Sequence, residues 1–398
     1  MVEAASKKRK MFTTGVILAI IVAILLLKDC MGGCKKTPPP PPPAPIVEKK
    51  VELPPPPPPA PKKKVVEKKA PVKKKEEWFQ KGICYIVWSK DHYASKRSDK
   101  SLEKLVTTNA KWVGLHTTWY QEHYTSTEIY RGGKSPTDES LIHAIEKIHE
   151  LGLNVMLKPH LDLINSEGGE WRGSIEFETE EEWQAWFESY TNFAVHYAKL
   201  AQENNVELYC IGTELSATTI VKPDMWRGVI KAVREVYKGP LTYASNWDGE
   251  YLDISFWSDL DYAGIDPYFP LSEAMQPSLE EIKEGWKSWF AQIEQWQKKM
   301  NQPVIFTEIG YASSTGAAKE PWEHMPGKYA DTKLQEACYE ALYQTFWDEP
   351  WFAGLYWWMW GGSVKIGGEN HRGFSPQNKP AEETIRTWYG KKTNKNPM

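Results

Sequence analysis

The sequence predicts an α/β fold, a (β/α)8 TIM barrel, and three observations support this prediction. Residues 78–390 alternate between short apolar runs and amphipathic stretches. The apolar runs lack the polar alternation of half-exposed strands, so they are typical of parallel strands that are buried on both faces. There are eight such runs, which is the number of strands in this barrel. A doubly wound open sheet is the alternative, but no glycine-rich phosphate-binding loop follows the first run.

The expected strands are short and rich in the β-branched and aromatic residues that favour extended structure. In chain order they are residues 83–88, 112–117, 154–159, 207–212, 241–246, 261–266, 303–308 and 353–358.

The stretches between these runs show the spacing of apolar residues at three and four positions that predicts amphipathic helices. In residues 181–204 the aromatic residues fall on one face, with Glu, Gln and Lys opposite. Thr137 and Ser278 precede acidic residues, as helix N-caps do. A short stretch, 250–257, follows the fifth strand. The other expected helices are 99–109, 137–151, 223–238, 278–300, 331–347 and 380–389.

Charge and aromatic residues are distributed unevenly along the chain. The formal net charge is -3, but residues 1–77 contain 17 Lys and Arg against 7 Asp and Glu, so the remaining residues are strongly acidic. An acidic body argues against nucleic acid as a partner, since phosphate binding needs a basic surface. All 20 Trp residues follow residue 77, and an excess of tryptophan is suggestive of stacking on sugar rings.

The five cysteines show neither zinc-type spacing nor a dense disulfide framework. Cys84, Cys210 and Cys338 lie within apolar runs and are expected to be buried free thiols. Cys30 and Cys34 follow the hydrophobic segment near the N-terminus. The sequence does not decide whether either forms an inter-chain disulfide or carries a lipid.

The N-terminal segment is predicted to anchor the chain in a membrane. Residues 1–10 form a basic tail that is expected to stay in the cytoplasm. Residues 11–29 are the predicted anchor, and their apolar run, from about Met11 to Leu27, is near the lower limit for a transmembrane helix. A cleaved signal segment is the alternative, but Lys28 and Asp29 are not the small residues that cleavage prefers. The remaining chain is then expected to be periplasmic or extracellular.

Residues 30–77 are predicted to be a disordered Pro/Lys-rich linker. They contain two PPPPPPAP repeats, at 38–45 and 54–61, with several lysine clusters. Polyproline favours an extended rod, and like charges extend it further. The composition resembles the periplasmic arm of TonB-like energy-transducing proteins. The segment is expected to be a spacer, and binding of the basic linker to the cell wall is a secondary hypothesis. Residues 391–398 form a C-terminal tail.

Two glutamates are the strongest functional signal. Glu214 and Glu308 each follow an apolar strand, and the carboxyl ends of barrel strands converge on one face. Burying a carboxylate is costly, so a glutamate at such a position is unusual. Glycoside hydrolases use two carboxyl groups, one to protonate the leaving oxygen and one to attack the anomeric carbon or activate water. The alternative is that each glutamate pairs with Lys or Arg and only stabilises a loop.

The other residues expected at the strand ends are polar or aromatic, which fits a cleft that binds a sugar. A metal site at His160 and Asp162 is the weaker interpretation, and no metal or organic cofactor is expected. Asp266 is expected either to tune the proton affinity of Glu214 or to pair with Lys158. The expected substrate-binding residues are Trp88, His116, Trp119, Lys158, His160, Asn246, Trp247, Asp266, Tyr268, Trp358 and Trp360.

Four motifs resemble glycoside hydrolase family 113, a family of clan A retaining glycosidases whose members are chiefly β-mannanases. They are IGTELS (211–216), GIDPYFPL (264–271), FTEIGY (306–311) and GLYWWMWGG (354–362). The resemblance covers roughly residues 80–390.

The resemblance implies that Glu214 is the general acid/base and Glu308 the nucleophile. It also implies that Tyr268 holds the nucleophile and that Trp358 is the platform beneath the sugar. Much of clan A has Asn directly before the acid/base, where this chain has Thr213. The departure leaves open which residue recognises the sugar 2-hydroxyl, and Asn246 is one candidate.

We therefore expect a retaining glycoside hydrolase that cleaves β-linked polysaccharide, in particular β-1,4-mannan, with endo action. Two alternatives are a non-catalytic glycan-binding module and a scaffold that tethers the membrane to the cell wall.

Overall fold

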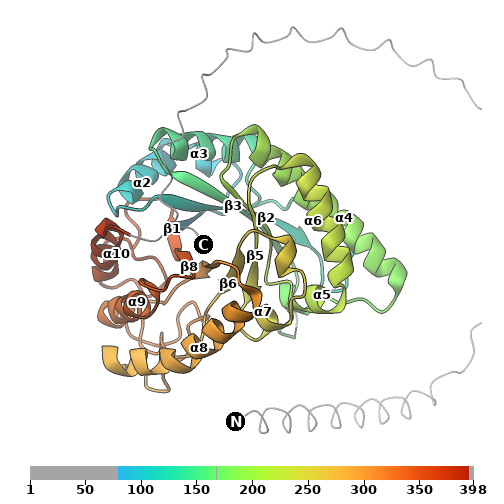
Figure 1. Cartoon of the computed structure of the whole chain (residues 1–398). Helices are drawn as coiled ribbons and strands as arrows, with labels where there is room; N and C mark the ends of the chain where they lie inside the picture. Colours follow the sequence, from blue (N-terminus) through green and yellow to red (C-terminus); the bar gives the residue numbers. More distant parts are fainter. Residues whose placement is uncertain (1–78, 167, 394–398) are drawn as a thin grey trace, which may run out of the picture. The chain divides into compact units, whose positions relative to one another are not determined.

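The computed structural model describes residues 79–166 and 168–393. In this part of the chain, eight parallel strands pair in sequential order and close into a barrel between β1 and β8, as Figure 1 shows. The predicted TIM barrel is therefore confirmed. The strands are β1 (Gln80–Ile86), β2 (Trp112–Gln121), β3 (Asn154–Leu163), β4 (Leu208–Thr213), β5 (Leu241–Asn246), β6 (Ala263–Asp266), β7 (Val304–Ile309) and β8 (Phe352–Gly361).

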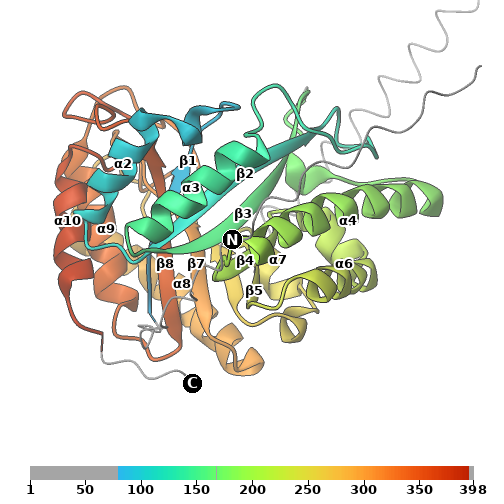
Figure 2. The same cartoon turned by 90° about the horizontal axis from the view of Figure 1, so that it is seen from above.

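Helices surround the ring of strands (Figures 1 and 2). Each long helix overlaps a predicted one, whereas α5 was not predicted. The helices are α2 (Lys96–Val106), α3 (Asp138–Glu150), α4 (Glu180–Glu203), α5 (Ser216–Val221), α6 (Pro223–Val236), α7 (Glu250–Asp253), α8 (Leu279–Met300), α9 (Thr332–Phe346) and α10 (Pro380–Gly390), with 3-10 turns η1 (His92–Ala94), η2 (Arg172–Ser174) and η3 (Trp257–Asp259).

The predicted helix starts are confirmed by their capping bonds. The Thr137 hydroxyl accepts a hydrogen bond from the Ser140 N–H at 3.2 Å. Ser278 forms a capping box with Glu281, in which each side chain accepts from the backbone N–H of the other residue. These bonds satisfy donors that the first turn of a helix leaves unpaired.

The core has two parts, separated by the strands. Ile83 and Tyr85 belong to the layer between barrel and helices, whereas Cys84 belongs to a smaller cluster inside the barrel. This alternation follows from the two-residue period of a strand. Many tryptophans, including Trp186 and Trp226, are fully buried in the outer layer, so much of the aromatic excess is structural. Cys84, Cys210 and Cys338 are buried free thiols, as predicted.

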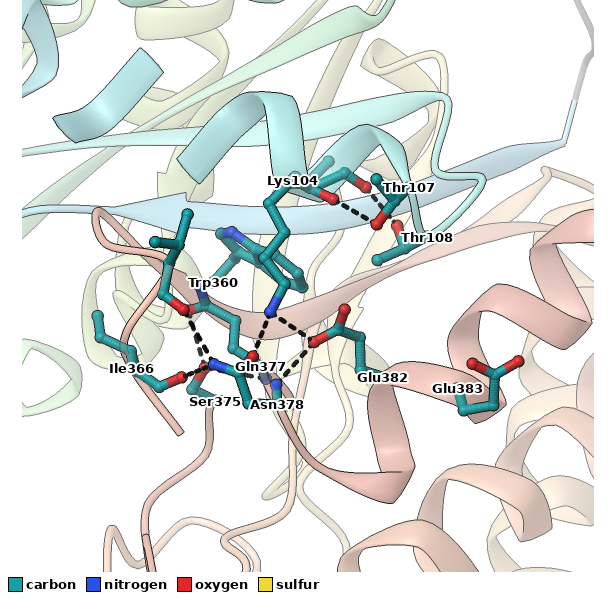
Figure 3. A network of polar contacts seen from close by, with 12 residues as sticks. Lys104, Thr107, Thr108, Trp360, Ile366, Ser375, Gln377, Asn378, Glu382 and Glu383 are labelled. Carbon is teal, nitrogen blue, oxygen red and sulfur yellow. Dashed lines mark hydrogen bonds and ion pairs between the residues drawn. The ribbon is translucent and has the colours of Figure 1, made fainter. Parts of the chain in front are cut away.

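The last strand is fixed to the first outer helix by a polar network, shown in Figure 3. The Lys104 ammonium in α2 donates to Asn378 Oδ1 at 2.6 Å and contacts Glu382 Oε2 at 3.1 Å. The same ammonium lies 5.6 Å from the ring centroid of Trp360 in β8. The Trp360 indole in turn donates to Ser101 in α2. These contacts connect α2, β8 and α10 at the seam where the barrel closes.

Among the residues described, no helix combines the length and hydropathy that a membrane span requires. The predicted basic tail (1–10), anchor (11–29) and linker (30–77) lie outside these residues, as do Cys30 and Cys34.

Candidate active site

Both predicted glutamates lie at irregularities of the barrel. On β4, Cys210 and Thr213 pair with Thr242 and Ala244, so β4 carries one extra residue just before Glu214. Such bulges turn a side chain away from the regular alternation of a strand and are common beside active sites.

The backbone of Glu214 is itself unusual. It adopts a left-handed conformation with φ of 53°, which few residues other than glycine accept. Its N–H donates to the Ala244 carbonyl at 2.8 Å, which holds this conformation.

Glu308 lies within a second irregularity. Phe306 and Ile309 of β7 pair with Leu355 and Trp357 of β8, again with one extra residue on the glutamate strand. The Tyr268 hydroxyl donates to Glu308 Oε1 at 2.7 Å, and the Lys158 ammonium donates to Oε2 at 3.0 Å. Both carboxylate oxygens are therefore held from different sides, which fixes the orientation of the group.

Lys158 is fully buried, and it also contacts Asp266 Oδ2 at 3.0 Å. Burial by itself lowers the pKa of Lys158, but the carboxylates of Asp266 and Glu308 outweigh it and raise the pKa above its ordinary value. Lys158 is thus a cation. Asp266 pairs with Lys158, which was one of the two roles expected from the sequence.

Glu214 has an environment that suits a proton donor. Burial raises its pKa, the positive charge of Arg172 opposes this shift, and the charge of Glu308 adds to it. The Asn246 amide donates to Glu214 Oε1 at 2.9 Å, and Arg172 Nη2 lies 3.6 Å from Oε2. A carboxyl group with a raised pKa retains its proton to higher pH than an ordinary glutamate and can deliver it to a leaving group.

Arg172 and Glu250 are part of the site although no sequence pattern pointed to them. Arg172 lies in η2, where Asp162 Oδ1 accepts from its Nη1 at 3.2 Å. Glu250 begins α7 and accepts hydrogen bonds from the Asn246 N–H at 2.6 Å and the Tyr243 hydroxyl at 2.7 Å. Glu250 therefore positions Asn246, and through it Glu214. A single Arg or Glu in a short helical turn carries no signal in one sequence.

Two histidines and a tryptophan lie beside the nucleophile. His116 Nδ1 and His160 Nε2 are 3.1 Å apart, and the rings of both pack against Trp358. Burial lowers the pKa of each imidazole, and Lys158 lowers both further. Both rings are therefore neutral at neutral pH and available to bind uncharged hydroxyl groups. His116 Nε2 has no hydrogen-bond partner among the described residues.

His116, His160 and Glu308 lie close enough together to be tested as a metal site, with one ligand atom from each residue within 4.8 Å of the others. Their surroundings do not fit a divalent cation, because Lys158 and Tyr268 already bind both oxygens of Glu308, and the Lys158 charge would repel a second cation. The absence of a metal stays a prediction.

Four of the predicted aromatic residues pack against other parts of the molecule than the two glutamates or are exposed. Trp119 packs against α4, where its indole donates to the Tyr197 hydroxyl at 2.7 Å. Trp360 is fully buried against α2. Trp88 follows β1 and is 48% exposed, and Trp247 stacks on Trp322 with ring centroids 5.1 Å apart.

Trp360 faces outward because β8 is irregular. Ile83 and Tyr85 of β1 pair with Trp357 and Trp360 of β8, so three steps on β8 match two on β1. The extra residue reverses the alternation, and Trp360 points to the same outer layer as Trp357 rather than to the side of Trp358.

The chain is similar to known glycoside hydrolases. The profile of glycoside hydrolase family 113 matches residues 84–379. A structure described as a complex of a family 113 β-1,4-mannanase has 27% identity and a TM-score of 0.71, covering 79% of this chain and 99% of that chain. The family 113 β-mannanase AaManA from Alicyclobacillus acidocaldarius, in complex with ManMIm, has 27% identity and a TM-score of 0.70, covering 78% of this chain and 97% of that chain.

A β-glucuronidase from Ruminococcus gnavus shares only the fold, with 15% identity and a TM-score of 0.53 over 79% of this chain and 50% of that chain. No curated protein sequence gives a significant match. The family match spans most of the chain and includes both glutamate motifs, and the chain therefore belongs to glycoside hydrolase family 113.

Proposed function

We propose that this glycoside hydrolase cleaves β-1,4-linked mannan within the chain and with retention of configuration. The observation that carries the proposal is the contrast between the two glutamates. Glu308 is held rigidly by Tyr268 and Lys158, as a nucleophile requires, whereas Glu214 has a raised pKa, as a proton donor requires. The similarity to β-1,4-mannanases supports this choice of sugar.

The mechanism has two displacements. In the first, a Glu308 oxygen bonds to the anomeric carbon as the bond to the glycosidic oxygen breaks, and the proton of Glu214 passes to that oxygen. In the second, a water oxygen bonds to the anomeric carbon, one proton of the water passes to Glu214, and the ester bond to Glu308 breaks. Glu214 is thereby returned to its protonated state and Glu308 to its carboxylate.

We assign the substrate contacts to the residues that border these glutamates. His116, His160 and Asn246 offer hydrogen-bonding atoms to sugar hydroxyl groups, and Trp358 offers a ring face. Trp88 and Trp247, the latter with its stacked partner Trp322, are proposed as platforms for sugar units further along the polysaccharide.

For localisation, we propose that residues 11–29 hold the protein in the cytoplasmic membrane and that the linker (30–77) carries the enzyme domain on the periplasmic or extracellular side. The support is the basic cluster Lys7–Lys10 before the apolar run and the proline repeats after it. Fractionation of cells that express the full chain or a variant without residues 1–30 tests this, since only the full chain should sediment with membranes. A full chain that stays in the soluble fraction contradicts it.

The test of activity is a panel of β-linked oligosaccharides, including manno- and gluco-configured chains, incubated with the full chain and with Glu308→Ala. Products are followed by NMR, which reports the anomer that forms first. Cleavage of internal mannose linkages with the β-anomer first supports the proposal. Preference for another sugar, or the α-anomer first, overturns the corresponding part of it.

A further inference from the structure

We propose that Lys158 and Asp266 are a positioning pair that compensates the changing charge of Glu308 through both displacements, an inference that rests on the proposed function. Neither residue needs to touch the substrate for this role.

The geometry isolates the pair from solvent. Lys158 and Asp266 are both fully buried, and they come from β3 and β6, on different sides of the barrel. The Lys158 ammonium lies 3.0 Å from Asp266 Oδ2 and 3.0 Å from Glu308 Oε2, so it bridges two carboxylates. Asp266 Oδ1 also accepts from the Thr307 hydroxyl at 2.6 Å. Water cannot screen these charges, so their balance must come from the side chains themselves.

That balance changes during the reaction. Burial raises the pKa of Asp266, and the positive charge of Lys158 opposes this shift. Because the Lys158 ammonium lies 3.0 Å from Oδ2, we take Asp266 as a carboxylate. In the free enzyme one cation then lies between two carboxylates, which leaves one net negative charge at the nucleophile. In the glycosyl-enzyme Glu308 is a neutral ester, and Lys158 and Asp266 then cancel each other. Without Asp266, formation of the ester would leave the Lys158 ammonium buried without a counter-charge, which is costly.

Single neutral replacements disturb this balance in opposite directions. Asp266→Asn leaves Lys158 uncompensated in the glycosyl-enzyme, so formation of the ester should slow while its hydrolysis should not. Lys158→Met instead leaves Asp266 and Glu308 facing one another without the cation between them. The two carboxylates then share a proton, and because a protonated Glu308 is a poor nucleophile, ester formation should slow here too.

The double variant Lys158→Met/Asp266→Asn restores the charge balance. It has one net negative charge before ester formation and none after, as the wild-type protein has. A pair that acts through charge therefore predicts that the double variant is faster than either single variant. Residues that act only through packing predict a double variant no faster than the slower single variant, because neighbouring replacements can share damage to a buried cluster but cannot repair it.

The experiment uses the full chain and 2,4-dinitrophenyl β-mannobioside, whose release of dinitrophenolate reports ester formation as a burst and ester hydrolysis as the following steady rate. Each single variant is expected to lower the burst rate on the order of 10- to 100-fold, as loss of a partner to a charged group does. The double variant is expected to recover roughly a factor of ten over the slower single variant.

Thr307→Val is the matched control, since it removes a hydrogen bond to Asp266 without changing any charge. Combined with Lys158→Met, it should give no recovery. If Lys158→Met fails to fold, comparison of the double variant with Asp266→Asn decides the question. If the double variant also fails to fold, Asp266→Asn alone decides it, through slower ester formation with unchanged hydrolysis.

A double variant no faster than the slower single variant, or equal slowing of both steps in Asp266→Asn, overturns the pairing while leaving the proposed function intact. A wild-type protein that does not release dinitrophenolate above the rate of Glu308→Ala instead overturns the proposed function.

Discussion

The side-chain amide of Asn246 donates a hydrogen bond of 2.9 Å to Oε1 of Glu214, across the boundary between β5 and β4. Asn246 is itself held by Glu250, which accepts from its backbone N–H at 2.6 Å. The proton donor is therefore oriented by a chain of contacts that begins at Glu250 in α7.

Replacing Asn246 should impair catalysis without unfolding the protein. Asn246→Ala removes the donor to Glu214, which becomes a carboxylate as it gives up its proton. We expect kcat to fall by about 10- to 100-fold, corresponding to the roughly 1.5–3 kcal/mol of a hydrogen bond to that charged group. Asn246→Asp should be worse, because it places a second carboxylate against Glu214. Steady-state kinetics on mannan, with a melting curve for each variant, provide the measurement. If Asn246→Ala and the wild type had equal kcat, Asn246 would have no role in orienting Glu214.

The role of Glu214 predicts a dependence on the leaving group. Glu214→Ala should lose nearly all activity on mannan, since a sugar leaving group needs a proton. With 2,4-dinitrophenyl β-mannobioside, ester formation should persist because dinitrophenolate leaves unprotonated, and the ester should then accumulate. Mass spectrometry of the protein detects this adduct. Azide should accelerate turnover of Glu214→Ala and give the β-glycosyl azide, whereas any azide product of Glu308→Ala should be the α-anomer. Azide rescue of neither variant, or the reverse anomers, contradicts the assignment.

The charge of Arg172 should affect the alkaline limb of the dependence of kcat/KM on pH. Burial raises the pKa of Glu214, and the positive charge of Arg172 partly opposes this. Arg172→Gln removes that opposition, so the pKa of Glu214 should rise and the alkaline limb of kcat/KM should move to higher pH. Arg172→Lys keeps the charge and is the matched control, with a limb near that of the wild type. A limb that moves to lower pH in Arg172→Gln refutes this electrostatic role.

The ionisation of Glu250 should make the stability of the protein depend on pH. Burial raises its pKa from the ordinary 4.5 to about 7, outweighing the hydrogen bonds that it accepts. Between these values the folded protein holds a proton that the unfolded chain has released, so stability falls as pH rises through this window. The loss is at most about 3 kcal/mol.

The side chain introduced by Glu250→Gln cannot ionise. The melting temperature of this variant should therefore rise relative to that of the wild type as pH increases from 4.5 to 7. Differential scanning calorimetry at several pH values measures this gain. Curves that stay parallel across the window would show that Glu250 is not responsible.

Replacing Trp226 should lower the stability of the fold. It is fully buried, packs against Tyr190 and Tyr243 with ring centroids 5.0 and 5.3 Å away, and donates to Thr218 Oγ1. Trp226→Ala should cost about 3–5 kcal/mol of unfolding free energy, because the cavity cannot refill. Ile220→Ala, at a position that is 46% exposed, should change stability by less than about 0.5 kcal/mol. Urea unfolding of both variants provides the comparison, and similar losses would contradict the packing argument.

The strands and long helices could be predicted from the sequence because the patterns that indicate them are local and periodic. Continuous apolar runs and helical stripes depend only on nearest neighbours in an element, so strands and long helices were predicted within a few residues. α5 was missed because six residues are too few to show a helical period. Glu214 and Glu308 were visible for a similar reason, since a charge that ends a buried strand breaks a local pattern.

What the tertiary structure decided is which side chains meet. Trp358 and Trp360 look equivalent in the sequence, yet the register shift between β1 and β8 turns Trp360 outward. Lys158 and Asp266 could not be assigned as a pair until the barrel brought β3 and β6 to a common interior. Arg172 and Glu250 acquire their roles from partners distant in the sequence. The physical reason is that periodicity is encoded within an element, whereas charge compensation in a dry interior depends on distances between elements, which only the closed barrel sets.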